Sequence, residues 1–278
     1  MKTITKPTDL TLAAEVPYVS AEEAEQLMLV EIERFLDLMD TLEPEDWEKP
    51  TACSAWNVRD ILAHQAGGYA GGASLREMLR QGRQKPGPGE LPEDAVNAFQ
   101  LRERADRTPE ELIAELREVG PTAARKWAHG YRLFKPFSIP HPDEGRLSFR
   151  HLMWVIHSRD TWMHRLDICR AVGREFFQTA AHDGRIAALV MRDTARVLER
   201  KTANPPLRIE LTGTAGGAWR TGEGEPDVEP EAEVRMDALA FNIFASGRTR
   251  FEGARPQMEI TGDVRAAEAA LEQLLVLY

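Results

Sequence analysis

The chain is poor in cysteine, in basic charge and in long apolar runs. Only two of its 278 residues are cysteines, so no disulfide framework is expected and a reducing compartment is indicated. The 35 basic residues face 45 acidic ones, and the net charge of −10 argues against nucleic acid or an anionic membrane as the main partner. No run approaches the roughly 18 apolar residues of a membrane span, and no signal-peptide pattern opens the chain. We therefore expect a cytoplasmic protein with small-molecule partners.

Motifs of several enzyme classes are also missing. Neither Ser54 nor Ser246 lies in Gly-x-Ser-x-Gly, so serine hydrolase chemistry is not indicated. Glycines at 67, 68, 71 and 72 suggest a phosphate loop, but no strand precedes them and no lysine follows at the P-loop spacing. They indicate room for a substrate or a close approach of helices. Cys53 and Cys169 are interpreted as inert, because a thiol nucleophile needs a base or a cation beside it.

Apolar residues at helical spacing dominate the first two thirds of the chain. Ser20 with Glu23 forms a capping box before a helix over about 20–42, and Asn57 with Asp60 suits the start of a second helix. Further helices separated by loops rich in proline and glycine are predicted over about 93–105, 109–128, 149–173 and 179–198.

The period of the pattern changes after Asn204-Pro205-Pro206. Residues 207–212 alternate between apolar and polar as a half-buried strand does, and 233–236 and 258–260 repeat this more weakly. Helices over about 237–246 and 263–277 interleave with them. The predicted fold class is α+β, with an N-terminal arm (1–19), a helical metal-binding domain (20–203) and a small α/β domain (204–278).

Asp160 and His164 are four residues apart in a predicted helix, so they share one face. Together they offer two ligands for a metal ion, and His64, on another apolar helix, is the best candidate for a third. Three protein ligands leave one coordination position open, as in catalytic zinc sites. A histidine on an apolar helix is also a common structural residue, and spacing alone supports both interpretations equally.

The remaining histidines have simpler interpretations. His157 lies in the same helical stripe as Asp160, and we interpret it as a residue behind a ligand or as a pocket wall. Asp167 with Arg165 is interpreted as a surface or inter-helix ion pair. Exposed or structural roles are expected for four others: His129, His141, His151 and His182.

Two stretches resemble the signatures of the mycothiol-dependent maleylpyruvate isomerase family, a branch of the DinB-like group of metal-dependent proteins. They are residues 51–64 (TACSAWNVRDILAH) and 160–167 (DTWMHRLD). The resemblance implies a four-helix bundle that holds a divalent metal, usually zinc, followed by a small domain related to sterol carriers. His64, Asp160 and His164 then become the metal ligands. Where this chain has Asp160 the family pattern has glutamate, which puts metal affinity in question.

The resemblance also implies a cofactor and an arginine near the metal. Mycothiol would bind through its sulfur, and coordination to zinc turns a thiol into a thiolate. In an isomerase that thiolate adds to a conjugated double bond and is expelled after rotation, whereas in a transferase the adduct leaves as product. Arg248 is the favoured position for an arginine that holds a carboxylate or an enolate, with Arg250 and Arg255 as rivals.

Two other classes of function stay open at this stage. The chain would be a non-catalytic metal-binding or lipid-binding protein if its apolar ligand lay in the C-terminal domain and the bundle site were vestigial. It would be a zinc hydrolase if water took the position of the thiol. Retention of His64, Asp160 and His164 argues against a vestigial site.

Overall fold

The computed structural model describes residues 11–141, 145–222 and 229–278, which fold into two compact units. The helical unit comprises Val19–Phe176 with Tyr278, and the sheet unit comprises Phe177–Leu277 with the described part of Met1–Tyr18. The predicted class, helices first and a mixed region after them, is confirmed. None of the helices in the described ranges is long and apolar enough to span a membrane.

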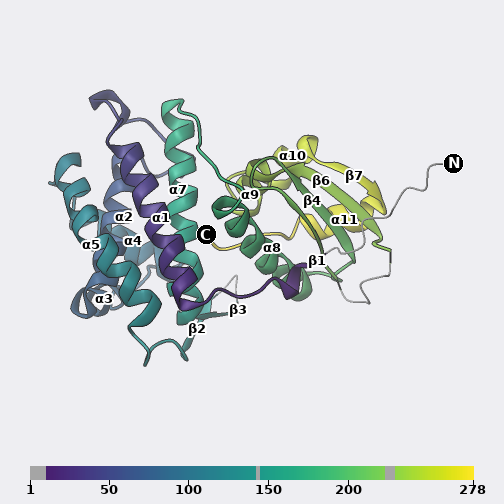
Figure 1. Ribbon diagram of the computed structural model, residues 1–278, viewed down its shortest axis with the longest axis horizontal. Helices are drawn as coiled ribbons and strands as arrows, with labels where there is room; N and C mark the ends of the chain where they lie inside the picture. Colours follow the sequence, from purple (N-terminus) through teal and green to yellow (C-terminus); the bar gives the residue numbers. More distant parts are fainter. Residues whose placement is uncertain (1–10, 142–144, 223–228) are drawn as a thin grey trace. The chain divides into compact units, whose positions relative to one another are not determined.

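Four long helices form the core of the helical unit, and Figure 1 shows them side by side. Shorter helices and a hairpin complete this unit. The long helices are α1 (Ala21–Met39), α2 (Val58–Ala73), α5 (Pro109–His129) and α7 (His157–Val172). The shorter elements are the 3₁₀ turn η2 (Pro44–Asp46), α3 (Leu75–Gln81), α4 (Pro92–Arg102), β2 (Ser138–His141), β3 (Gly145–Ser148) and α6 (Phe149–His151).

Side chains at the predicted caps start the bundle helices. Ser20 Oγ accepts a hydrogen bond from the Glu23 amide (3.1 Å) at the start of α1. Asn57 and Asp60 exchange two such bonds before α2, because each side chain accepts from the backbone amide of the other. These bonds satisfy amides that have no partner inside the helix and so fix where it begins.

A π-helical turn (Leu152–Ile156) leads into α7. The amide of His157 donates to the carbonyl of Leu152, five residues earlier, so this turn holds one residue more than an α-helical turn. At the other end α7 stops at Gly173, whose φ of 73° lies in the left-handed region that a residue with a Cβ adopts at a cost.

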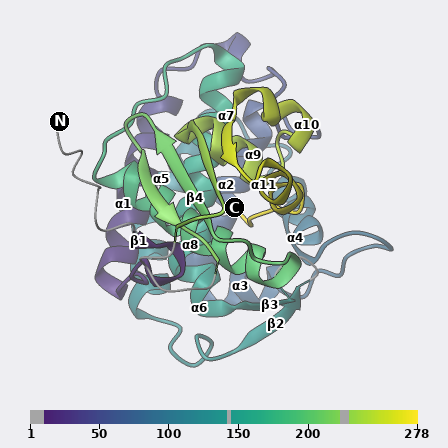
Figure 2. The same ribbon diagram turned by 90° about the vertical axis from the view of Figure 1, so that its right-hand side faces the viewer.

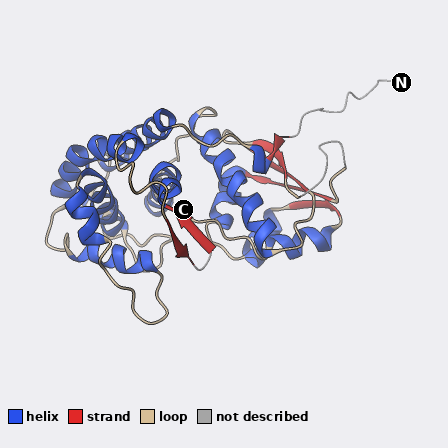
Figure 3. Cartoon of the chain, turned by 90° about the horizontal axis from the view of Figure 1, so that it is seen from below, coloured by secondary structure: helices blue, strands red, loops and turns tan. Residues whose placement is uncertain are grey.

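A five-stranded mixed sheet forms the second unit, with the order β1-β5-β4-β6-β7 among the described residues. Figure 3 shows the strands in red, the β2–β3 hairpin being the pair outside this sheet. The strands are β1 (Thr11–Leu12), β4 (Leu207–Thr212), β5 (Gly217–Arg220), β6 (Ala232–Asp237) and β7 (Glu259–Gly262). The helical elements are η1 (Ala13–Glu15), α8 (His182–Lys201), α9 (Ala238–Ala245), α10 (Phe251–Ala254), η4 (Arg255–Gln257) and α11 (Val264–Leu271).

The sheet has one apolar face and one charged face. Alternate residues of β4 and β6 are buried. Helices α8, α9 and α11 contact these strands or their neighbours, and Figure 2 shows the three helices together with β4. On the other face Arg235 pairs with Glu210 (3.2 Å) and Glu259 (3.3 Å) across three strands. This alternation is the one predicted for 207–212, and it accounts for a two-layer unit.

The units divide the chain at a different point from the predicted boundary at 203. Helix α8 belongs to the sheet unit, because it contacts η1, β5 and α9. Within the predicted arm, β1 pairs in parallel with β5 and Ala13 is fully buried, so residues 11–18 are an integral part of the sheet unit. Residues 1–10 lie outside the described residues.

Several short elements have no counterpart in the sequence prediction: α3, α10, β1, β5 and the β2–β3 hairpin. The last helix, predicted over 263–277, ends at Leu271. These differences share a cause, because segments of two to seven residues carry too few apolar positions to establish a period.

Glycines of α2 allow other helices to approach it closely. A Cβ at Gly72 would overlap the indole of Trp127 on α5, and a Cβ at Gly67 would lie 2.7 Å from the Gln100 Cβ on α4. A Cβ at Gly68 would meet nothing within 4 Å. Of the two roles considered for these glycines, close helix packing therefore applies to Gly67 and Gly72.

We predict that Gly72→Ala lowers the free energy of unfolding by about 1–3 kcal/mol, because the added methyl displaces Trp127. Gly68→Ala is the matched control on the same helix. It should leave stability unchanged or raise it by up to about 1 kcal/mol, since alanine favours the helix. Urea unfolding of both variants measures the difference, and equal stability would contradict the packing role of Gly72.

Candidate metal centre

Three side chains predicted as metal ligands converge inside the helical bundle. His64 lies on α2, and Asp160 and His164 lie one turn apart on α7. The two carboxylate oxygens of Asp160 face different rings: Oδ2 lies 3.3 Å from His64 Nε2, and Oδ1 lies 3.3 Å from His164 Nε2. One ligand atom from each residue falls within 4.8 Å of the others. The packing of α2 against α7 thus joins residues about 100 positions apart in sequence.

The electrostatics of the cluster depend on attraction between opposite charges. Burial alone would raise the pKa of Asp160, but the positive charges of His164 and His64 hold that pKa well below its ordinary value. Burial alone would lower the pKa of His164, but the charge of Asp160 and its hydrogen bonds raise that pKa well above its ordinary value. The site therefore favours an ionised carboxylate, the form that binds a cation.

Each ring nitrogen that faces away from Asp160 has its own hydrogen-bond partner. His64 Nδ1 lies 2.8 Å from Gln100 Oε1 on α4, and His164 Nδ1 lies 3.1 Å from Asp167 Oδ2 on α7. Asp167 is almost fully buried, with a side-chain exposure of 1%. Metal-binding histidines commonly donate their second N–H to such an acceptor, which fixes the ring.

A separate chain of hydrogen bonds holds Asp160. Gln65 Nε2 donates to Asp160 Oδ2 (2.6 Å), and Gln65 Oε1 accepts from Thr161 Oγ1 (2.8 Å). Tyr69 Oη lies 2.8 Å from the same threonine oxygen and completes the chain. Because the side chains of Gln65, Thr161 and Tyr69 are all buried, the carboxylate is held from inside the bundle.

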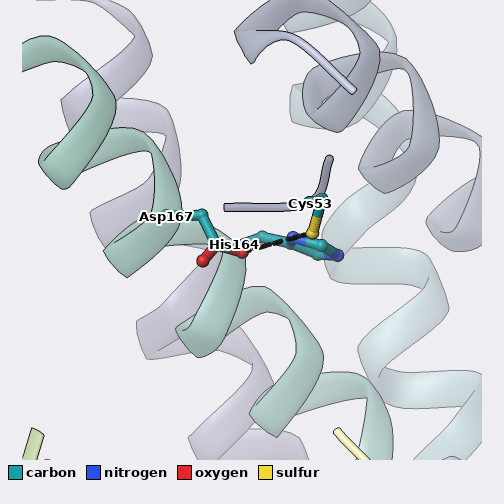
Figure 4. Close-up of side chains that lie close together, drawn as sticks. All are labelled: Cys53, His164 and Asp167. Atoms are coloured by element: carbon teal, nitrogen blue, oxygen red, sulfur yellow. Dashed lines mark hydrogen bonds and ion pairs between the residues drawn. The ribbon is translucent and has the colours of Figure 1, made fainter. Parts of the chain in front are cut away.

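The loop before α2 adds Cys53 and Trp56 to the site. Trp56 lies across both imidazoles, with ring centroids 4.9 Å from His64 and 5.7 Å from His164. Figure 4 shows the Cys53 thiol beside His164 and Asp167, where Sγ lies 4.0 Å from Nδ1 and 3.6 Å from Oδ2. The cysteine and tryptophan of the first signature therefore cover the same cluster to which its final histidine belongs.

Two groups of described residues that could hold a metal ion overlap here, one of His64, Asp160 and His164 and the other of Cys53, His164 and Asp167. A neutral imidazole has one nitrogen with a free lone pair and one N–H. His164 would therefore bind an ion in one of the two groups only, while its other nitrogen donates a hydrogen. In the first set His164 Nδ1–H donates to Asp167, whereas in the second Nε2–H would face Asp160. The first set agrees with the sequence prediction and uses Asp167 to orient the ring.

One of the two roles predicted for Asp167 and Arg165, an ion pair at the surface, is wrong, because these residues are 1% and 3% exposed. Arg165 binds the buried Glu31 of α1, with Nε 3.0 Å from Oε2. Cys53 has contacts with His164 and Asp167 that the sequence does not predict.

The predicted arginine lies in the sheet unit, and its role stays a prediction. Arg248 follows α9 and is partly buried, and its backbone amide donates to Ile243 O (3.1 Å). Arg255 binds Glu268 (2.6 Å) and the carbonyl of Met258, so its guanidinium is engaged within its own unit. This contact weakens Arg255 as a rival of Arg248.

Comparison with known families gives a clear result. A family model described as the mycothiol maleylpyruvate isomerase N-terminal domain matches residues 29–169, about half the chain, and this span includes His64, Asp160 and His164. The chain belongs to this family. No curated protein sequence matches it.

Two solved structures share the fold of this chain. Both are crystal structures of the mycothiol-dependent maleylpyruvate isomerase, one of them a histidine-to-alanine mutant. Each has a TM-score of 0.56 and 14% sequence identity, and the match covers 92% of this chain and 98% of the other. At this identity the similarity establishes the fold alone.

His157 stacks on Trp127 of α5, with ring centroids 3.6 Å apart and planes 7° from parallel. Its carbonyl, rather than its ring, joins the hydrogen bonds around Thr161. Burial, helped by the charge of His64 and opposed by Asp160, lowers the pKa of His157 to about 4. The ring is therefore neutral in the folded protein at pH values where it is charged in the unfolded chain.

We predict that His157 makes the protein less stable as the pH falls from 6.5 to 4. Over that range the unfolded chain binds a proton that the folded protein does not, so unfolding is favoured by at most about 3 kcal/mol. His157→Phe keeps the stacking and removes the titration. With a chelator present, denaturant unfolding should show a smaller loss for this variant, and parallel pH profiles would contradict the assignment.

Proposed function

We propose that this chain is a metal-dependent and mycothiol-dependent enzyme that isomerises a short conjugated acid similar to maleylpyruvate. The observation that carries this proposal is the convergence of His64 Nε2, His164 Nε2 and the Asp160 carboxylate in one family-matched site. Family membership and the fold of the two isomerase structures support the reaction class.

The donor set fits a catalytic divalent cation, with zinc as the preferred candidate. Two imidazoles and one carboxylate are a known ligand set of catalytic zinc, and they leave one position for an exogenous ligand. Ligand atoms about 2.0–2.2 Å from zinc lie roughly 3.3–3.5 Å apart in a tetrahedron. The two Asp160 oxygens, each 3.3 Å from a different ring nitrogen, lie at about this spacing, which supports Asp160 as a ligand in place of the family's glutamate.

When bound, the cation lowers the pKa of a coordinated thiol and so supplies a nucleophilic sulfur at neutral pH. The protein's residues do the remaining work. Asp160 is kept ionised, Asp167 and Gln100 orient the two imidazoles, and Trp56 covers the rings against water.

Arg248 is proposed to bind a substrate carboxylate or to stabilise an enolate during the reaction. A guanidinium offers paired N–H donors that match such oxygens.

We predict that the purified protein binds about one equivalent of zinc and that His64→Ala removes it, because two ligands hold the ion far less tightly than three. His182→Ala, on α8 of the sheet unit, is the matched control and should keep the metal. Cys53→Ser should also keep the metal, which distinguishes the two overlapping ligand sets. Metal analysis by mass spectrometry decides the matter, and full zinc content in His64→Ala would refute the ligand assignment.

We predict that the zinc form converts maleylpyruvate only when mycothiol is present, and that Arg248→Ala lowers kcat/KM by roughly 10²–10³-fold at unchanged zinc content. Arg265→Ala, an exposed arginine on α11, is the control and should retain activity. Product analysis by mass spectrometry identifies the class of reaction. A released thiol adduct would indicate a transferase, and turnover without thiol would indicate a hydrolase.

A further inference from the structure

A chain of buried amide groups lies behind His64. His64 Nδ1 is 2.8 Å from Gln100 Oε1, Gln100 Nε2 donates to Gln81 Oε1 (2.9 Å), and Gln81 Nε2 donates to the Gly67 carbonyl (2.8 Å). Gln81 and Gln100 are 6% and 3% exposed, and they come from the loop-linked helices α3 and α4. The chain begins and ends on α2, at positions 64 and 67.

The direction of these hydrogen bonds is set by the far end of the chain. A backbone carbonyl only accepts, and Glu77 Oε1, which lies 3.2 Å from Gln81 Nε2, accepts from the same amino group. The amino group of Gln81 must therefore face both of them, and its oxygen must face Gln100. Gln100 in turn presents its amino group to Gln81 and its oxygen to His64.

From this order we infer that Gln100 and Gln81 are positioning residues that place a hydrogen on His64 Nδ1 and reserve Nε2 for the cation. The oxygen of Gln100 requires a donor, and Nδ1 is the atom that faces it. Nε2 is then the ring nitrogen directed at Asp160 and the open site. The part of this inference that concerns a cation rests on the proposed function, whereas the hydrogen on Nδ1 does not.

The use of an amide rather than a carboxylate at this position has an electrostatic reason. Asp160 and Asp167 already place two negative charges beside the two imidazoles, which balances a divalent ion. A third carboxylate behind His64 would give the buried site an excess negative charge, and burying unpaired charge is costly. A glutamine orients the ring as well and adds no charge.

Gly67 supports the same chain in two ways. Its carbonyl is the terminal acceptor, and its lack of a side chain makes room for Gln100, whose Cβ and Cγ would each lie 2.7 Å from an added Cβ. Gly67, three residues after His64, is therefore tied to the orientation of that histidine. This link explains why a small residue is needed one helical turn from the proposed ligand.

The experiment uses full-length protein labelled with ¹⁵N-histidine, with and without zinc, in long-range ¹H–¹⁵N spectra of the imidazoles. In both forms His64 should carry a hydrogen on Nδ1, and in the zinc form Nε2 should be the ligated nitrogen. Gln100→Met keeps the length of the side chain and removes the amide. It should raise the zinc dissociation constant by roughly 10–100-fold and expose the Nδ1 hydrogen to exchange with water.

Three further variants separate positioning from a general effect on stability. Gln84→Met, at a partly exposed glutamine that bonds the Arg80 carbonyl, is the matched control and should bind zinc like the parent protein. Gln81→Met should weaken zinc binding less than Gln100→Met does. Gln100→Glu should keep the hydrogen on Nδ1, because a carboxylate accepts from it. A merely structural role would change unfolding without changing which nitrogen is protonated.

Two results would overturn the inference: ligation of zinc through His64 Nδ1, or an unprotonated Nδ1 in the parent protein. A dissociation constant for Gln100→Met within twofold of the parent value would also overturn it. If the protein binds no zinc, the proposed function fails, and the spectra of the metal-free parent protein still decide whether Gln100 places the hydrogen. These parent spectra need no variant, so they decide the question even if Gln100→Met does not fold.

Discussion

The attraction between one carboxylate and two imidazoles organises the helical unit. Asp160 lies between His64 and His164 and faces each ring with a different oxygen. Isolated in the bundle, any one of these groups would be costly to bury in its charged form, and together they reduce that cost. The same arrangement makes α2 and α7 dependent on each other, because a shift of either helix would separate the charges. A bound divalent ion would take the place of the protons between Asp160 and the two imidazoles, and its larger charge would attract the carboxylate more strongly.

Polar contacts surround this cluster on the protein side. Gln65 and Thr161 hold the carboxylate, Gln100 holds one ring and Asp167 holds the other. Such a network is stabilising when every member has a partner and destabilising when one is missing, so its members depend on one another. The same contacts between helices therefore hold the bundle together and orient the proposed ligands.

Local patterns in the sequence predict the fold class and bring out the proposed ligands, but they do not predict the residues behind those ligands. Asp160 and His164 are neighbours on one helix, and their spacing of four is visible without a structure. Asp167 lies three residues after His164, and this spacing was available but has many structural explanations. Gln100 lies 36 residues from His64, and only the packing of α4 against α2 brings them together.

The boundary between the helical unit and the sheet unit also could not be predicted from local patterns alone. The apolar stripe of α8 indicates that one face is buried, but it does not indicate which partner covers that face. The sequence places this helix with the bundle, whereas its contacts place it with the sheet. Strand β5 was missed because its four residues include Gly217 and show no alternation of buried and exposed positions.

The π-helical turn before α7 has a consequence for evolutionary comparison. Because Leu152–Ile156 contains one residue more than an α-helical turn, residues before and after it differ in phase by about 100°. A relative without this insertion would present the acid and the histidine of its second signature at a different angle to the residues that precede the helix. An alignment of this chain with such a relative would need a one-residue gap in this stretch.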